Sequence, residues 1–451
     1  MFKKLMCMSL SVLFLIILCG TAPASAAFDW KAHSGTEIKL LLNKHPYTDA
    51  LLAHLDEFTE KTGITVTYDV FPEDEYFDKV TVSLSSKSPE YSLFMTGAYQ
   101  VWQYAPPGFM EDLRPFMDDP EKTNPDWDEA DIYENLLSSL AWNLKPGDPL
   151  GTEDAKQWAL PWGFETNTLI YRKDIFDKHG LTPPKDLPEL LELSKKLQEL
   201  EPDMYPIAVR GTRSWATIHP GFLSCYNGYG VKDYEPFPKP AMNSPKAVEM
   251  TKMWVDMVKN YGPKAWTSYI WYEVGNDLGQ GRACMIYDAD ILGYFQNQPG
   301  ASPVAGKLAW APGPGAPGAA PAPNMWIWSL GMNASSETKD AAWYFLQWAT
   351  GKDFLLKAVR GKFSLVDPVR KSIWADPEFQ KKLENFTDYY QTFQTIIANC
   401  KVYFTPQPLF FETTTEWAAT LHEIYNGKDA QEALDGLVNR LTRTLQRAGY
   451  K

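Results

Sequence analysis

The sequence is poor in cysteine, with five among 451 residues. Only Cys225, Cys284 and Cys400 lie beyond residue 26. Three cysteines allow at most one disulfide, which excludes a scaffold that disulfides hold together. Because 45% of the residues are apolar, we expect a hydrophobic core to stabilise the fold instead.

The motifs of common catalytic and metal sites are also missing. No two of the six histidines lie at the spacing of metal ligands, and there is no C-x-x-C pair. No G-x-S-x-G motif and no phosphate-binding loop is present. Distant residues could still form a Ser-His-Asp triad, and two carboxylates could form a glycosidase pair, but no segment indicates either. The sequence therefore predicts no metal and no cofactor.

Long hydrophobic runs are absent after the first 26 residues. The N-terminus combines Lys3 and Lys4, an apolar run from Leu10 to Leu18, and the small residues Ala24-Ser25-Ala26. This pattern is typical of a secretory signal peptide, here residues 1–26, that is removed by cleavage. The protein is therefore expected to be exported, to the periplasm or to the cell surface.

Two other interpretations of this N-terminus remain open. The apolar run could be a retained membrane anchor, but it is shorter than the roughly 20 residues that span a bilayer. Cys19 could carry a lipid, but it follows Leu18, whereas a lipidated cysteine usually follows a small residue. Cleavage is therefore the preferred interpretation.

An excess of positive charge is absent as well. Cleavage removes Lys3 and Lys4 from the 43 basic side chains and none of the 56 acidic ones, which leaves a net charge near −15. Nucleic acids and anionic lipids attract proteins of the opposite sign. The charge thus argues against a nucleic-acid partner and against attachment to an anionic membrane surface.

Segments with strand and helix periodicity alternate along the chain. Residues 37–42 are typical of a buried strand, residues 48–63 of an amphipathic helix, and residues 64–70 of a half-buried strand. Later segments repeat this pattern, with strands predicted at 167–172, 282–292 and 326–332, a Pro/Gly/Ala loop at 311–323, and helices at 186–200, 336–359 and 429–448. This alternation predicts an α/β fold with a largely parallel sheet, and the length suggests two or more lobes.

Tryptophan is abundant, with 17 residues. An aromatic-rich turn with one carboxylate is predicted from Trp158 to Glu165, before the strand at 167–172. Aromatic faces suit the C–H surfaces of sugars, and ligands of open α/β sheets bind beyond the carboxyl ends of strands. Arg210 and Asp288 also lie at predicted strand ends, so the pattern indicates a ligand site, although a single tryptophan is more often buried in a core. Seven tryptophans lie near predicted strand ends or loops: Trp162, Trp215, Trp266, Trp271, Trp310, Trp326 and Trp328.

Three blocks of the chain resemble a known family. They read ALPWGFETNTLIYRKDIFDKHGLTPPKDLPELLELSKKL, LGQGRACMIYDADIL and IWSLGMNASSETKDAAWYFLQWAT. In this order they are similar to the sugar-binding group of the extracellular solute-binding proteins of ABC importers. The stretches TGAYQVWQYAPPGFMEDL and MWIWSLGM are similar to the polyol-binding branch of that group.

The resemblance implies two α/β lobes joined by crossings near Glu165, Asp288 and Ser329. A ligand between the lobes would select the closed form, which docks on the membrane permease and releases the ligand unchanged. A monomeric binding protein for a sugar or sugar alcohol, without enzymatic activity, is therefore expected. The expected lobes comprise residues 27–163 and 289–328 (lobe 1), and residues 164–288 and 329–451 (lobe 2).

The resemblance also gives candidate ligand contacts. Glu165, Asp288 and Arg210 are expected to hydrogen-bond hydroxyl groups, with a salt bridge between the lobes as the alternative for Glu165 and Arg210. Tyr47, after the first strand, is a further candidate, with packing on the first helix as its alternative. The expected stacking residues and the residues of the lobe 1 wall, the latter in a predicted loop, are Trp162, Trp215, Trp326 and Trp328, and Thr96, Tyr99 and Gln100.

Two other functions remain open at this point. A secreted glycoside hydrolase would also need tryptophan platforms and paired acids, and it would cleave an oligosaccharide. A structural envelope protein would bind no small ligand in a saturable manner. The order of the three blocks favours the binding protein.

Overall fold

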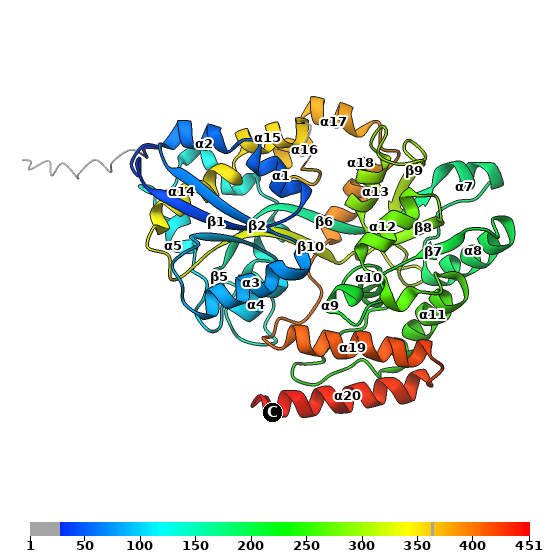
Figure 1. Ribbon diagram of the computed structural model, residues 1–451. Helices are drawn as coiled ribbons and strands as arrows, with labels where there is room; N and C mark the ends of the chain where they lie inside the picture. Colours follow the sequence, from blue (N-terminus) through cyan, green and yellow to red (C-terminus); the bar gives the residue numbers. More distant parts are fainter. Residues whose placement is uncertain (1–27, 362–364) are drawn as a thin grey trace, which may run out of the picture.

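The longest strand, β6 (Ala159–Arg172), runs through the middle of the molecule and connects its two halves (Figure 1). The structure, a computed structural model, describes residues 28–361 and 365–451. The predicted signal peptide, residues 1–26, lies outside the described residues. Every residue of β6 except Arg172 is buried, as expected for a central strand covered on both faces.

Eight strands form one sheet in the order β2-β1-β3-β10-β6-β8-β7, with β9 paired to β6. The β1–β2, β1–β3 and β7–β8 pairs are parallel, whereas β6 and β10 run antiparallel to their neighbours. The prediction of a largely parallel sheet is therefore wrong. The central strands β6 and β10 run antiparallel to each other and to the strands on either side of them. The other strands are β1 (Glu37–Asn43), β2 (Thr65–Phe71), β3 (Leu93–Thr96), β4 (Ala141–Trp142), β5 (Lys156–Gln157), β7 (Tyr205–Ala208), β8 (Ala283–Ala289), β9 (Leu308–Pro312) and β10 (Met325–Met332).

Strand β6 divides the sheet into two half-sheets. Its residues 159–166 pair with β10, and its residues 167–172 pair with β8 and β9. Strand β9 lies in the range expected for lobe 1, yet it pairs with the second half of β6. The end of β10, from Ser329 to Met332, lies in the range expected for lobe 2, yet it pairs with β3.

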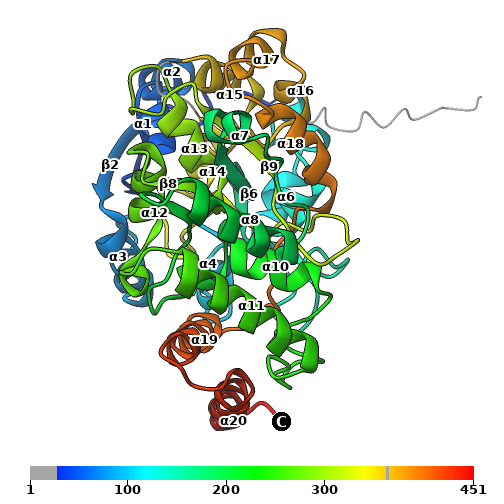
Figure 2. The ribbon, with the colours of Figure 1, turned by 90° about the vertical axis from the view of Figure 1, so that its right-hand side faces the viewer.

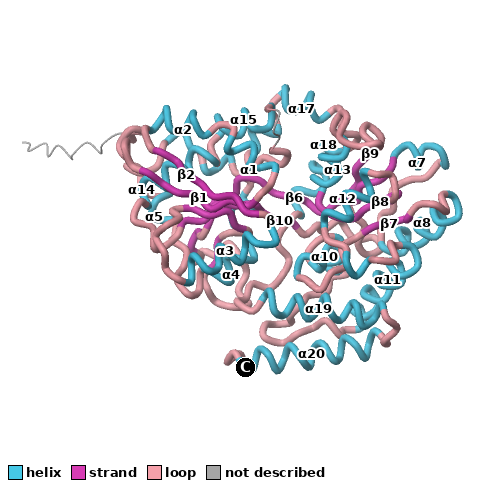
Figure 3. Tube along the Cα trace, in the orientation of Figure 1, coloured by secondary structure: helices cyan, strands magenta, loops and turns pink. Residues whose placement is uncertain are grey.

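Helices lie on either side of the strands (Figure 3). The last two, α19 and α20, pack against each other at one end of the molecule (Figure 2). The helices of the described chain are α1 (Pro46–Leu52), α2 (Leu55–Thr62), α3 (Glu73–Ser85), α4 (Ala98–Tyr104), α5 (Arg114–Met117), α6 (Glu134–Ser138), α7 (Lys173–His179), α8 (Leu187–Leu200), α9 (Trp215–Ile218), α10 (Gly221–Gly228), α11 (Pro245–Tyr261), α12 (Trp271–Gly279), α13 (Asp290–Asn297), α14 (Lys339–Ala349), α15 (Lys352–Arg360), α16 (Lys371–Trp374), α17 (Pro377–Leu383), α18 (Tyr389–Ile396), α19 (Phe410–Tyr425) and α20 (Ala430–Arg447).

Two predicted helices are confirmed almost residue for residue. Helix α8 follows Asp186, whose side chain accepts a hydrogen bond from the backbone N–H of Glu189. Helix α20 follows Asp429, whose side chain accepts one from Glu432 in the same way. An aspartate at this position satisfies a backbone donor that the first helical turn leaves without a partner.

Three predicted segments are divided in the structure. The helix predicted at 48–63 is two helices, α1 and α2, and the helix predicted at 336–359 is interrupted at Gly351, between α14 and α15. Glycine is unfavourable inside a helix because it loses much conformational freedom there. The strand predicted at 282–292 ends before Asp290, where α13 begins, because a short apolar run does not distinguish a strand from a buried helix.

Two predicted connections are regular elements instead. The aromatic-rich turn predicted from Trp158 to Glu165 is mostly the first half of β6. Thr96 ends β3, and Tyr99 and Gln100 lie in α4 rather than in a loop. The connection is a single residue, Gly97, where a Cβ atom would lie 2.4 Å from the ring of Trp326, so the tight passage requires glycine.

Among the described helices, none combines the length and apolar character that crossing a membrane requires. The His, Cys, Asp and Glu side chains of the described residues form no group of three that could hold a metal ion. Cys225, Cys284 and Cys400 are buried free thiols.

Candidate ligand-binding site

A cavity of about 80 Å³ lies between the two half-sheets. It is found where parallel strands end: His45 and Glu73 follow β1 and β2, and Arg210 and Ile291 follow β7 and β8. Ligands of open α/β sheets bind at such edges. The lining residues are His45, Pro46, Glu73, Phe77, Glu165, Arg210, Trp215, Ala216, His219, Trp271, Ile291, Leu292, Phe295, Trp326 and Trp328.

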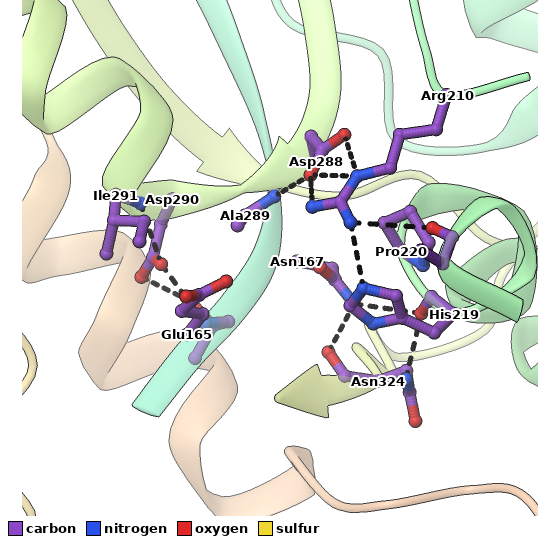
Figure 4. A network of polar contacts seen from close by, with 12 residues as sticks. Glu165, Asn167, Arg210, His219, Pro220, Asp288, Ala289, Asp290, Ile291 and Asn324 are labelled. Atoms are coloured by element: carbon purple, nitrogen blue, oxygen red, sulfur yellow. Dashed lines mark hydrogen bonds and ion pairs between the residues drawn. The ribbon is translucent and has the colours of Figure 1, made fainter. Parts of the chain in front are cut away.

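The central cation of the cavity is Arg210, which forms a bidentate ion pair with Asp288 of β8 (Figure 4). Arg210 Nε and Nη2 lie 2.9 and 2.6 Å from the carboxylate oxygens of Asp288. Burial is the largest single influence and acts to lower the pKa of Arg210, but the charge and hydrogen bonds of Asp288, together with the other nearby acids, raise this pKa above its ordinary value, so the guanidinium stays charged. The two parallel bonds fix the plane of the guanidinium at the cavity wall.

The ring of His219 contacts a third position of this guanidinium. Arg210 Nη1 donates to His219 Nε2 over 3.1 Å, so the ring proton is on Nδ1. Within the described part of the chain, this buried Nδ1 has no hydrogen-bond partner. Burial and the charge of Arg210 hold the pKa of His219 well below its ordinary value. His219 is therefore neutral and has one unused N–H donor.

Glu165 lies in the other half-sheet from Arg210, and Trp328 and His45 of that half-sheet hold its carboxyl group. Trp328 Nε1 donates to Glu165 Oε1 over 2.7 Å, and His45 Nε2 lies 3.7 Å from the same oxygen. Burial raises the pKa of Glu165 to about 8, although the bond from Trp328 and the charge of Arg210 act in the opposite direction. Burial also lowers the pKa of His45 to about 3. Both side chains are therefore largely uncharged at neutral pH.

Four indole rings line the cavity, and three of them, which we call the aromatic wall, are those of Trp215, Trp326 and Trp328. Trp326 and Trp328 lie two residues apart on β10 and so point to the same face of the strand. The centroid of the Trp326 ring lies 5.1 Å from that of Trp328 and 5.2 Å from that of Trp215 in α9. Trp326 Nε1 is buried and has no hydrogen-bond partner among the residues that the structure describes.

Five of the predicted contacts line the cavity, and six do not. Asp288 is fully buried and occupied by Arg210, so the ion pair forms within one half-sheet and not between Arg210 and Glu165. Tyr47 donates its hydroxyl group to the Phe164 carbonyl. The five lining residues are Glu165, Arg210, Trp215, Trp326 and Trp328, and the six that do not line the cavity are Asp288, Trp162, Tyr47, Tyr99, Thr96 and Gln100.

The sequence reasoning missed several lining residues. His45 and Glu73 follow strands that were predicted correctly, so the rule of strand ends could have found them. Phe77 and Phe295 lie one helical turn further along α3 and α13. No sequence signal shows which face of these helices is directed at the cavity.

Glu165→Gln is expected to remove part of the pH dependence of stability. Folding raises the pKa of Glu165 from 4.5 to about 8, so the folded protein keeps a proton that the unfolded chain releases within this range. The contribution of Glu165 to the free energy of unfolding is complete below pH 4.5 and is lost as the pH rises to about 8, at about 1.4 kcal/mol per pH unit. Urea unfolding at a series of pH values measures this slope in both proteins.

Burial also raises the pKa of Asp290, to about 7, and the charge of Asp290 helps to raise that of Glu165. Asp290 titrates in both proteins, so the difference between them reports the proton of Glu165 together with its interaction with Asp290. Equal slopes for the wild type and Glu165→Gln would contradict a protonated Glu165 in the folded state.

Comparison with known proteins identifies the family. A model of the bacterial extracellular solute-binding proteins matches residues 44–354. The erythritol/L-threitol-binding protein of Mycolicibacterium smegmatis is 43% identical over 428 residues, which cover 94% of this chain and 89% of that protein. The mannitol-binding protein of Pseudomonas aeruginosa is 24% identical over 294 residues, which cover 64% of this chain and 63% of that protein.

Solved structures confirm the two-lobed fold. A solute-binding protein of Agrobacterium vitis, solved with bound D-mannitol, has a TM-score of 0.77 at 24% identity and covers 92% of this chain and 99% of its own. These relatives are binding proteins and not enzymes, so the glycoside hydrolase alternative is overturned. The chain belongs to the family of bacterial extracellular solute-binding proteins.

Proposed function

We propose that this protein binds a short acyclic polyol, of the size of erythritol, in the cavity between its half-sheets, and delivers it to the permease of an ABC importer. The observation that carries the proposal is a cavity that combines indole faces with two polar groups, the guanidinium of Arg210 and the carboxyl group of Glu165. Aromatic faces can contact the C–H surface of a polyol, and its hydroxyl groups can accept hydrogen bonds from the guanidinium and donate to the carboxyl group.

The charges at the cavity favour a neutral ligand. Asp288 balances the charge of Arg210, and Glu165 and His45 are largely uncharged at neutral pH. A ligand carboxylate would come close to Glu73, and a ligand ammonium group would come close to Arg210. A polyol brings no charge and can both donate to and accept from the cavity groups.

The size of the cavity favours a ligand of a few carbons. A volume of about 80 Å³ corresponds to several water molecules at about 10–15 Å³ each, which suits a small ligand. The relative from M. smegmatis is named for binding erythritol and L-threitol, and both are four-carbon polyols. Its 43% identity along most of the chain supports the same ligand class here.

The two half-sheets are the basis of the proposed lobes. We assign β1, β2, β3, β10 and their helices to lobe 1, and β7, β8, β9 and theirs to lobe 2, with β6 shared between the lobes. A polyol that contacts both lobes selects the closed form, and the hinge opens to release it. In this proposal the protein acts as a monomer after cleavage of a signal peptide at residues 1–26. It binds no nucleic acid and uses no cofactor.

A thermal-shift screen of residues 27–451 tests the ligand class. We expect erythritol or L-threitol to raise Tm, because a ligand at about 100 times its Kd adds about 2.7 kcal/mol to the free energy of unfolding. Ribitol and mannitol are expected to give smaller shifts, because they are longer than the four-carbon polyols for which the relative from M. smegmatis is named. Maltose, amino acids and polyamines serve as controls and are expected to give none. A shift with maltose or an amino acid alone would contradict the proposal.

A further inference from the structure

Asn324, the residue before β10, is fully buried where the chain crosses between the half-sheets. Its side-chain Nδ2 donates to the Tyr99 hydroxyl over 2.9 Å and to the His219 carbonyl over 2.8 Å. Its Oδ1 accepts from the backbone N–H of Tyr403 over 3.1 Å. Both polar atoms of this side chain are therefore bonded, which is what a buried amide requires.

The backbone of Asn324 is bonded as well. Its N–H donates to Ser224 Oγ over 3.0 Å, and its carbonyl accepts from Asn167 Nδ2 over 2.8 Å. Asn324 thus connects segments that are far apart in the sequence: α4, β6, the residues around α9 and α10, and the chain near residue 403.

One of these bonds leads directly to the ligand cavity. The His219 carbonyl accepts from both Asn324 Nδ2 and Asn167 Nδ2, at 2.8 and 3.2 Å. The ring of the same residue accepts from Arg210. The amides of Asn324 and Asn167 therefore hold the backbone of His219, and the ring of His219 accepts a hydrogen bond from the guanidinium of Arg210 (Figure 4).

The other bond of Nδ2 leads to the aromatic wall. The ring of Tyr99 lies with its centroid 5.4 Å from that of Trp326 and 5.6 Å from that of Trp215. Both tryptophans line the cavity, whereas Tyr99 and Asn324 do not. A single amide group is thus bonded both to the residue behind the indole rings and to the residue beside Arg210.

We propose that Asn324 is a positioning residue for the ligand site. It does not touch the ligand, but its amide holds His219 and Tyr99 so that Arg210, Trp215 and Trp326 keep the geometry that binds the ligand. The inference depends on the proposed function for its ligand, because erythritol is the probe of binding. In the ligand-free protein too, the amide holds the backbone carbonyl of His219 and thereby the position of its ring.

The matched control is Asn333, which has the same bonding pattern away from the cavity. Its Nδ2 donates to the carbonyls of Ser88 and Tyr91, both over 2.9 Å, and its Oδ1 accepts from the N–H of Ser335. Asn333 is 1% exposed, comparable to Asn324 at 0%. Asn324→Ala and Asn333→Ala therefore remove the same number of side-chain hydrogen bonds.

The test measures the Kd of erythritol, its dissociation rate and Tm in both variants and in Asn324→Asp. Both alanine variants are expected to have a lower Tm than the wild type. Only Asn324→Ala is expected to weaken erythritol binding, by at least about tenfold (about 1.4 kcal/mol), through faster dissociation. Asn324→Asp keeps the shape and loses the donor to the His219 carbonyl, so it is expected to weaken binding as well. Binding within about twofold of the wild type in both Asn324 variants would overturn the proposal.

A second readout needs no ligand. The ¹⁵N shifts of the His219 ring report its tautomer, which is the Nδ1-protonated form in the wild type if Arg210 donates to Nε2. This signature is expected to be lost in Asn324→Ala and kept in Asn333→Ala, and its persistence in Asn324→Ala would overturn the inference. If the wild type did not bind erythritol, the proposed function would fail, and the His219 signal would still decide the role of Asn324.

Discussion

Arg210→Met is expected to weaken polyol binding about 100-fold and to lower the free energy of unfolding by about 3–5 kcal/mol. The loss of affinity follows from removing a charged donor, whose hydrogen bonds contribute about 1.5–3 kcal/mol. The loss of stability follows from leaving Asp288, which is fully buried, as an uncompensated charge. Calorimetric titration and urea unfolding of the same preparations measure the two effects.

Two further variants separate binding from stability. In Arg210→Met/Asp288→Asn no buried charge is left alone, so most of the stability is expected to return while the affinity stays low. Arg370→Met removes another buried arginine, which pairs with Asp131 and does not line the cavity. It is expected to lose stability and to keep the wild-type Kd. Restored binding in the double variant would show that Arg210 does not contact the ligand.

Trp328→Ala is expected to produce the second large effect, a loss of about 100-fold in affinity. The substitution removes an aromatic face of the cavity together with the donor to Glu165 Oε1. It also leaves a void where a ring that is 4% exposed stood, and such truncations cost about 3–5 kcal/mol of stability. Titration with erythritol and urea unfolding measure the two losses.

A milder substitution distinguishes the ring from its N–H group. Trp328→Phe keeps an aromatic face and loses the bond to Glu165, so we expect a loss of affinity of about tenfold. Trp343→Phe is the matched control, because Trp343 is fully buried and donates to Thr123 Oγ1 away from the cavity. If both phenylalanine variants bound erythritol as the wild type does, Trp328 would contribute through its aromatic face alone.

Local sequence patterns predicted the elements whose ends are set locally. Helices α8 and α20 were found because Asp186 and Asp429 cap them and because their apolar residues recur with the helical period. The direction of β6 and β10 was not predictable in this way. The direction of a crossing strand depends on the half of the molecule to which the chain returns, and not on the residues of the strand itself. A buried antiparallel strand has the same apolar residues as a buried parallel strand.

The site was predictable to the extent that it depends on strand ends. Arg210 and Trp215 were found by this rule, and the alternation of side chains along β10 accounts for Trp326 and Trp328 together. The rule does not tell whether a residue at a strand end points into the cavity or beneath it. Asp288 satisfies the rule, yet its side chain is fully buried and bonded to Arg210.

Calorimetric titration of residues 27–451 with erythritol tests the central claim most directly. We predict saturable binding of one erythritol molecule per chain, lost in Arg210→Met and retained in Arg370→Met. Absence of binding to erythritol, L-threitol, ribitol and mannitol, together with binding of an oligosaccharide or an amino acid, would contradict the assignment of the cavity to a short polyol.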